Sequence, residues 1–450
     1  MHYLQLISYR SIHRNNVLRE SALKRNPSQR ISWLNYSGNM NDVYFRRRFR
    51  MHKECFANLV NVIKSEVGEL EFKSESFLER VLEEETQYKH MLKAQQDTCG
   101  GYICGEVKLA ITLRILSGGS YLDVSDIFNI EPKMCYKILH DTMKFWICNN
   151  NAMKIDVNDY LNDKTAMERN AVEFGKCSNN CLRNVIGALD GWLVKINCPK
   201  EKKEGIKSIG GYKSRKGFYA LNVQVIVNKQ KKVLWHCIKA RGGAHDSTAF
   251  KHTELYKDLV ERSKKLAEGD YFFVADSAYG IRSFLLTPYD NAPVGSKEDD
   301  FNYYLSRCRI YVECALGEID MRWGIFWKKL SFDLKNTVNI IDGAIKLHNF
   351  IIDFRENSNK SSENSLENYD QFVNDCTDFC KLYPDEVIGT FGDGRNDERH
   401  AGRNEKGIEL MRKYGMSFRE SLCRRLKKNG LHRQQKIFYR NKNNHVMIFH

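Results

Sequence analysis

Three acidic residues stand out because each places a carboxylate in or beside an apolar stretch. Asp190 follows the short apolar run 185–189, and Asp276 follows a second apolar run, 271–275. Glu313 lies among apolar neighbours in a segment that has the pattern of a long helix, an unusual setting for a merely solvated Glu. An acid directly after an apolar strand lies at the carboxyl edge of its sheet, where open α/β sheets bind their ligands.

Three carboxylates that meet at one point can support hydrolysis assisted by metal ions. Their mutual repulsion favours protonation unless cations neutralise them, and Mg²⁺ and Mn²⁺ prefer such oxygen ligands. Two ions about 3.5–4 Å apart can activate a water and stabilise the leaving oxygen of a phosphodiester. The structural alternative is that each Asp caps a turn and that Glu313 forms an ordinary salt bridge. Spacing alone leaves both interpretations open.

Residues 180–352 have the pattern of an α/β domain with a mixed sheet, which would position these acids. Apolar or alternating runs predict strands at 185–189, 218–227, 233–240 and 271–275, and helical patterns cover 246–267 and 300–328. The Ser-, Asn- and Glu-rich residues 355–370 predict a polar surface insertion. Residues 371–450 predict a helical segment followed by a basic tail.

The N-terminal third of the chain is expected to be helical. Residues 1–40 are polar and weakly patterned, which predicts a flexible arm, whereas residues 41–150 predict helices. Three short helices at about 106–146 suggest a helix-turn-helix, the third of which would expose Lys133 and Lys137. The arginine cluster at 46–50 is equally compatible with phosphate contact, a nuclear import signal and a solvated helix face.

The composition favours a polyanionic partner. The 450 residues carry a formal net charge of +15 with a pI of about 9.1, which points to nucleic acid before membrane. We expect no secretory signal and no membrane span, because no apolar stretch is long enough. The 14 cysteines are scattered and suit a reducing compartment. A zinc site remains the minor alternative to core thiols.

Several motifs, in this order and spacing, resemble those of PIF/Harbinger-type DDE transposases, including the Harbinger transposase-derived nuclease branch. The three central motifs contain the acids: IGALDG at 186–191, ADSAY at 275–279 and VECALG at 312–317. Further matches are RKG at 215–217, LNVQ at 221–224, GAHDS at 243–247 and KLHNF at 346–350. The resemblance runs over about residues 40–350. Trp192-Leu193 replace the family's usual Thr-His, and Ala278 replaces a Gly; neither change removes a carboxylate.

The resemblance implies an RNase H-like catalytic domain with a DDE triad of Asp190, Asp276 and Glu313. Asp190 would bridge two Mg²⁺ (or Mn²⁺) ions, and Asp276 and Glu313 would each hold one. The implied reaction is hydrolysis of a DNA phosphodiester by a metal-activated water, followed by attack of the freed 3′-hydroxyl on target DNA. The resemblance also implies a helix-turn-helix and a separate Myb-like DNA-binding partner protein.

Other residues are secondary candidates. His245 and Asp246 form a pair near the predicted active edge, where His245 could orient a water, contact phosphate or make a structural hydrogen bond. The predicted contacts to double-stranded DNA are Lys133, Lys137, Lys213, Arg215, Lys216, Arg309 and Arg322. Arg309 and Arg322 have an alternative role in ion pairs within the protein.

The expected setting is the nucleus, entered alone or with a partner, and a homo-oligomer is expected by analogy with such enzymes. The rival interpretation is a domesticated DNA-binding or scaffold protein that keeps the three acids and no longer cuts DNA.

Overall fold

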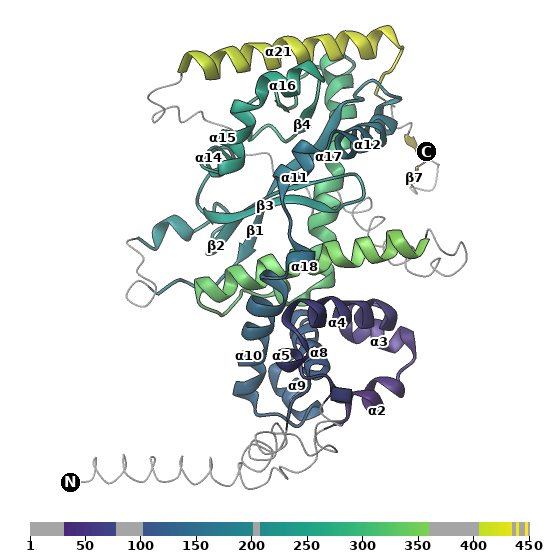
Figure 1. The fold of residues 1–450 in the computed structure, drawn as a ribbon. Coiled ribbons are helices and arrows are strands. Elements are labelled where there is room, and N and C mark those ends of the chain that lie inside the picture. Colours follow the sequence, from purple (N-terminus) through teal and green to yellow (C-terminus); the bar gives the residue numbers. More distant parts are fainter. Residues whose placement is uncertain are drawn as a thin grey trace, which may run out of the picture. The chain divides into compact units, whose positions relative to one another are not determined.

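The computed structural model describes residues 31–77, 102–200, 208–359, 405–433, 438–440 and 446–448 (Figure 1). The chain divides into two compact units. Unit 1 comprises Met1–Ala152 and Trp323–Ile325, and unit 2 comprises Met153–Arg322 and Phe326–His450. Each unit contains buried apolar side chains of its own.

Unit 1 is built from helices around an aromatic cluster. Trp33 is 6% exposed, and its ring lies 5.7 Å from that of Phe49 and 4.9 Å from that of Phe56. The elements in chain order are α2 (Trp33–Gly38), α3 (Asp42–Phe49), α4 (Lys53–Val67), α5 (Glu69–Phe72), α8 (Gly105–Leu116), α9 (Tyr121–Ile127), α10 (Pro132–Asp141), the π-helix η1 (Thr142–Cys148) and the 3₁₀-helix η2 (Asn151–Met153), which reaches the unit boundary.

The predicted flexible arm at residues 1–40 is wrong for its last part. Residues 33–38 form α2, because the Ser32 side chain caps the helix by accepting a hydrogen bond from the Asn35 N–H. Burial of Trp33 then anchors α2 to the core of unit 1. Residues 1–30 lie outside the described part of the chain.

Three helices lie where the sequence predicts them at about 106–146. Pro132 is the first residue of α10, where its missing N–H costs nothing. Cys135, Ile138 and Leu139 are buried, while Lys133 and Lys137 are exposed. The helices are thus confirmed; their use as a DNA-binding helix-turn-helix stays a prediction.

Unit 2 contains a mixed five-stranded sheet, consistent with the predicted RNase H-like domain. The strands are β1 (Val185–Lys195), β2 (Ala220–Val227), β3 (Val233–Arg241), β4 (Phe272–Val274) and β5 (Leu285–Leu286). Their order is β3-β2-β1-β4-β5. β1, β2 and β3 pair antiparallel, while β4 runs parallel to both β1 and β5.

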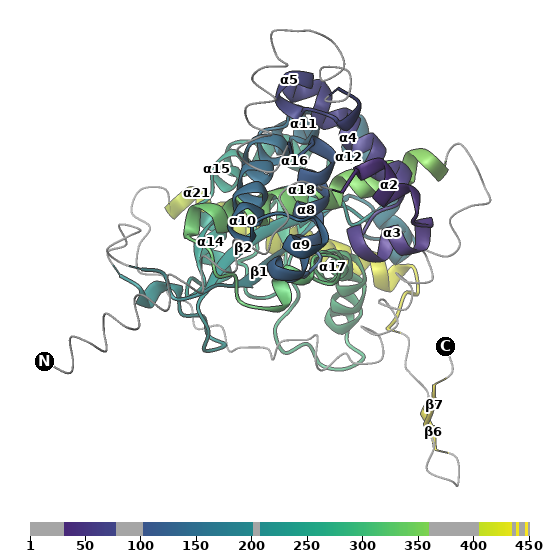
Figure 2. The same cartoon turned by 90° about the horizontal axis from the view of Figure 1, so that it is seen from below.

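Short helices supply much of the core beside this sheet. Their apolar side chains pack with those of β1, β2 and β4 in one buried cluster, and α14 lies beside β2 in both views (Figures 1 and 2). The predicted single helix at 246–267 is divided, because Thr253 caps a new helix by accepting from the Tyr256 N–H. The elements are α11 (Val157–Asn162), α12 (Lys164–Gly175), the 3₁₀-helices η3 (Lys176–Ser178) and η4 (Gly210–Tyr212), α14 (Asp246–Lys251), α15 (Glu254–Glu261) and α16 (Ser263–Glu268).

Three longer helices complete unit 2: α17 (Lys297–Arg322), α18 (Leu334–Asn359) and α21 (Glu405–Lys428). α17 packs against β1 and β2, and α21 packs against α17 and β5. The predicted helix at 300–328 ends earlier, and the 3₁₀-helix η5 (Gly324–Trp327) follows it. The short strands β6 (Phe438–Arg440) and β7 (Val446–Ile448) pair antiparallel with each other.

The KLHNF motif joins α18 to β3. Asn349 accepts from the Val233 N–H at 2.8 Å and donates to the Val233 carbonyl at 2.7 Å. His348 Nε2 lies 2.9 Å from the Lys231 carbonyl, and Lys346 pairs with Asp342 at 3.1 Å. The motif therefore satisfies backbone groups at the start of β3, which is a structural role.

The structure describes only parts of the predicted polar insertion and of the C-terminal segment. Residues 355–359 continue α18, so the prediction of a polar insertion is wrong for these five residues; residues 360–370 lie outside the described part. In the C-terminal segment the structure describes α21, residues up to 433, β6 and β7. None of the helices in the described ranges is long and apolar enough to cross a membrane.

Candidate active site

The three candidate acids come from β1, the end of β4 and α17. β1 and β4 are parallel neighbours with Ala188 opposite Val274, so Asp190 and Asp276 each lie two residues further along adjacent strands. The prediction that Asp190 ends its strand is wrong, because β1 continues to Lys195 in an unbroken ladder with β2. Asp276 does follow β4, as predicted.

Arg309 connects Glu313 to Asp190. Its Nη1 atom lies 2.6 Å from Glu313 Oε1, one turn along α17, and 3.5 Å from Asp190 Oδ2. All three side chains are largely buried, with about a fifth to a quarter of each exposed. One guanidinium thus contacts carboxylates from a strand and from a helix, and Arg309 is 119 residues from Asp190 in the sequence.

The pKa values show that the acids share one electrostatic environment. Burial, and next the charge of Asp276, raise the pKa of Asp190 to about 7, while Arg309 opposes the shift. Burial also raises the pKa of Asp276; Arg309 lowers it, and the charges of Asp246 and Glu313 raise it. Both aspartates therefore respond to Glu313 and to Arg309, and Asp190 also responds to Asp276, which indicates that these groups lie near one another.

Asp246 is a fourth carboxylate beside this site, held by amides. Its Oδ1 accepts from Asn222 Nδ2 at 2.7 Å and from Gln224 Nε2 at 3.3 Å. The buried hydroxyl of Tyr279 donates to Gln224 Oε1 at 2.7 Å, which fixes the orientation of that amide. A Cβ at position 191 would collide with the Asp246 carboxylate, so only Gly191 fits there.

His245 is the residue before α14 and is partly buried. Its Nδ1 lies 3.4 Å from the Ser247 hydroxyl. This contact shows the structural hydrogen bond that the sequence leaves open as one of its three possible roles. The roles in orienting a water or contacting phosphate stay predictions.

A basic loop precedes β2 and reaches Asp246. Lys213, Arg215 and Lys216 are exposed, and the Arg215 guanidinium lies 3.8 Å from Asp246 Oδ2. The Ser214 hydroxyl and N–H both donate to the Phe218 carbonyl at 2.8 Å, which closes the loop. The loop therefore presents positive charge beside the acidic centre.

Arg322 does not suit the DNA contact predicted for it. Its side chain is 6% exposed, and its charge lowers the pKa values of Glu318 and His348 inside unit 2. That prediction is wrong because the guanidinium lies among buried groups. The alternative, an electrostatic role within the protein near Glu318, agrees with these shifts.

The candidate acids carry the kind of oxygen atom that binds divalent cations. In this structure, however, they do not surround a position where a cation could bind. Within the described ranges, no three His, Cys, Asp or Glu side chains are placed to bind a common metal ion. Carboxylate oxygens are nevertheless the ligands that Mg²⁺ and Mn²⁺ prefer. The raised pKa values of Asp190 and Asp276, which come first from burial, mean that either a proton or a cation would stabilise these carboxylates. The residues therefore fit such an ion in the chemistry of their oxygen atoms, and Arg309 occupies the space beside two of them.

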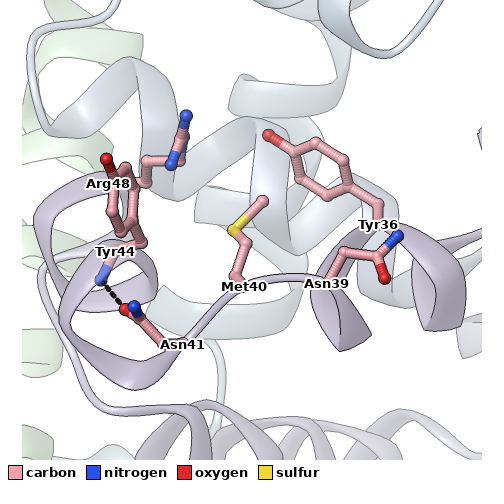
Figure 3. A pocket seen from close by; sticks show the side chains of 6 residues that line it. All are labelled: Tyr36, Asn39, Met40, Asn41, Tyr44 and Arg48. Carbon is pink, nitrogen blue, oxygen red and sulfur yellow. Dashed lines mark hydrogen bonds between the residues drawn. The ribbon is translucent and has the colours of Figure 1, made fainter.

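A separate pocket of about 420 Å³ lies in unit 1 on α2 and α3 (Figure 3). Figure 3 shows Met40 between Tyr36 on one side and Tyr44 with Arg48 on the other. The remaining lining residues are Asn39 and Asn41, and the Asn41 side chain accepts from the Tyr44 N–H at 2.9 Å. This lining contains no carboxylate, so the pocket does not share the chemistry of the acidic site.

Sequence reasoning missed the amide network and the bridging arginine. Asn222 and Gln224 belong to the motif LNVQ, and Tyr279 belongs to ADSAY. The motifs therefore pointed to these residues, but the sequence did not show what the residues do. Arg309 was expected to contact phosphate or to form an ion pair within the protein, and its contact with Asp190 was not predicted. Its i, i+4 spacing to Glu313 was the available signal.

Comparisons with known proteins cover the part of the chain that contains the candidate acids. Residues 189–349, which include all three candidate acids, match the family described as DDE superfamily endonuclease. Over 275 residues the chain is 25% identical to "Protein ALP1-like" of Arabidopsis thaliana, covering 58% of this chain and 64% of that protein. No solved structure matches the chain.

Residues 189–349 are therefore similar to a nuclease- and transposase-like domain. Together the two matches fit a Harbinger-type DDE family, which confirms the resemblance of the motifs. DDE superfamily endonucleases generally use divalent metal ions. The chain spans slightly less than two thirds of the length of the curated relative that it matches.

Proposed function

We propose that this protein is a metal-dependent DNA endonuclease of the transposase type, with Asp190, Asp276 and Glu313 as its catalytic acids. The observation that carries the proposal is that Arg309 contacts both Asp190 and Glu313, while its charge and that of Glu313 also act on the pKa of Asp276. All three lie within the matched DDE endonuclease range.

The chemistry would be hydrolysis of a phosphodiester, followed by transfer of the freed 3′-hydroxyl to target DNA. Asp190, Asp276 and Glu313 would hold Mg²⁺ or Mn²⁺, with Asp190 between two ions. Bound divalent ions supply charge stabilisation at the phosphate and lower the pKa of a coordinated water. Asp246 and its amide partners would keep the neighbouring backbone at Gly191 in place.

Positive charge near the acids would bind the DNA backbone. The exposed Lys213, Arg215 and Lys216 form one such surface in unit 2. Lys133 and Lys137, exposed on α10, form another in unit 1. Such contacts bind phosphates without reading the bases. By the same reasoning we propose a nuclear location, self-assembly into a homo-oligomer and a Myb-like DNA-binding partner protein.

Nicking of supercoiled plasmid tests this function. The wild-type chain should convert supercoiled to open-circular DNA with Mg²⁺ and lose that ability with EDTA. Asp190→Asn should bind DNA as well as wild type in a gel-shift assay that contains EDTA, and it should not cut DNA in Mg²⁺. Equal DNA binding with no cutting by either protein would overturn the proposal and support a domesticated, catalytically silent scaffold instead.

A further inference from the structure

Arg309 lies against the oxygen atoms that a metal ion would need. Its Nη1 atom contacts Glu313 Oε1 and Asp190 Oδ2, and its side chain is only 20% exposed. The same charge lowers the pKa values of both Asp190 and Asp276. Arg309 therefore offsets part of the negative charge of these carboxylates in the free protein, which a bound metal ion would also do.

A guanidinium and a divalent cation compete for these oxygens. Both are positive, so close approach of an ion to Asp190 and Glu313 would repel Arg309. The backbone of α17 need not move, because Arg309 and Glu313 lie one turn apart on that helix and a long arginine side chain can change its rotamer. Once displaced, the guanidinium would still require an anion.

The DNA backbone supplies such an anion. Arginine binds phosphate with two parallel hydrogen bonds, a geometry that lysine lacks. Arg215, which lies 3.8 Å from Asp246, already places exposed positive charge at the same site. A phosphate drawn to this surface would lie within reach of an Arg309 that has left the acids.

We propose that Arg309 is an internal counter-ion that couples metal binding to DNA binding. In the free chain it occupies the acids and weakens metal binding. When DNA is bound, its guanidinium moves to a backbone phosphate and the acids become available to metal. Linkage then requires the reverse effect, so metal must tighten DNA binding by the same factor. This inference rests on the proposed function and adds to it that DNA binding makes the acids available to the metal ions.

Two measurements without catalysis test the coupling in the full-length chain. Mn²⁺ binding without DNA is followed by electron paramagnetic resonance, for wild type and for Arg309→Gln. Binding of a fluorescent DNA duplex is followed by anisotropy with Ca²⁺ and with EDTA. We expect Arg309→Gln to bind Mn²⁺ at least about fivefold more tightly than wild type, the lower end of ordinary coupling between sites. Ca²⁺ should tighten DNA binding of wild type by a similar factor and of the variant hardly at all.

The control is Arg307→Gln on the same helix, because the Arg307 guanidinium lies over the rings of Tyr303 and Tyr304, 5.8 and 5.9 Å from their centroids. This variant should match wild type in both measurements. Arg309→Lys keeps a charge on the acids and lacks the two-pronged phosphate contact. It should bind Mn²⁺ nearly as weakly as wild type and lose the Ca²⁺ effect on DNA, which tests the coupling even if Arg309→Gln fails to fold.

The possible outcomes distinguish a failure of the role proposed for Arg309 from a failure of the proposed nuclease function. Equal or weaker Mn²⁺ binding by Arg309→Gln, with clear binding by wild type, would overturn the counter-ion role and leave the proposed nuclease intact. A Ca²⁺ effect that persists in Arg309→Lys would overturn the phosphate contact. Absence of Mn²⁺ binding in every variant, with and without DNA, would overturn the proposed function itself and the inference with it.

Discussion

Replacement of Asp190 by Asn should stabilise the metal-free protein at neutral and alkaline pH. Burial and the charge of Asp276 raise the pKa of Asp190 from 3.8 to about 7 in the folded chain. Near pH 3.5 the carboxyl is largely protonated in both states, so Asn and Asp behave alike. As the pH rises towards 7, the unfolded chain ionises first, and the folded wild type loses stability relative to the variant.

The expected gain in the free energy of unfolding follows from the size of the pKa shift of Asp190. Each pKa unit corresponds to about 1.4 kcal/mol, so a shift of this size costs the folded state about 4 kcal/mol once the acid is ionised. Because 19% of the side chain remains exposed, relaxation and water will reduce the cost. We therefore expect Asp190→Asn to raise the free energy of unfolding at pH 8 by roughly 2 to 4 kcal/mol.

Urea unfolding in EDTA between pH 3.5 and 8 measures this difference. Asp156→Asn is the control, because a hydrogen bond from Lys154 lowers the pKa of that surface carboxyl and its side chain caps α11. Its effect should have the opposite sign, with stability lost above about pH 4. A difference between Asp190→Asn and wild type that is constant across the pH range, or a less stable variant at pH 8, would refute the reasoning.

Three further substitutions have definite expectations. Gly191→Ala should destabilise the fold by about 1–3 kcal/mol in thermal unfolding, since the added methyl meets a carboxylate and the Gln224 amide; an unchanged midpoint would contradict the packing. Asn349→Ala removes both hydrogen bonds to Val233 from a buried site, so urea unfolding should show a loss of about 1–3 kcal/mol, whereas a neutral result would deny the link between α18 and β3. Lys216→Ala should weaken DNA binding equally for all sequences and reduce the salt dependence of log Kd by about 1; an unchanged salt dependence would exclude a phosphate contact.

The sequence was sufficient for the parts of the fold that follow local patterns. The alternating and apolar runs predicted β2, β3 and β4 within a few residues, and helical spacing predicted α8, α9 and α10. β1 was predicted too short because Asp190-Gly191 interrupts its apolar run, although pairing with β2 continues to Lys195. β5 has two residues, too few for any periodicity to appear.

The sequence was sufficient to predict which acids belong to the candidate site. It was not sufficient to predict which side chains contact one another there. Apolar surroundings and motif order singled out Asp190, Asp276 and Glu313, which come together through the parallel pairing of β1 with β4 and the packing of α17 on β1. The position of Arg309 depends on that packing, so no local pattern shows which acid it meets across the sheet. Arg322 was misjudged for the same reason, since burial is decided by the tertiary fold.

The central claim is that the three acids form one catalytic centre, and a mutant cycle of plasmid nicking tests it most directly. Initial rates of nicking in Mg²⁺ are compared for wild type, Asp190→Asn, Asp276→Asn and the double variant. Asp320→Asn is the control, because burial raises the pKa of the Asp320 carboxyl to about 7 as well, with Trp192 and Lys195 opposing the shift. We predict that either single variant falls to the background rate, that the double variant falls no further, and that Asp320→Asn still cuts. Nicking that survives in either Asp190→Asn or Asp276→Asn, or that declines stepwise as the two changes are combined, would contradict a single centre.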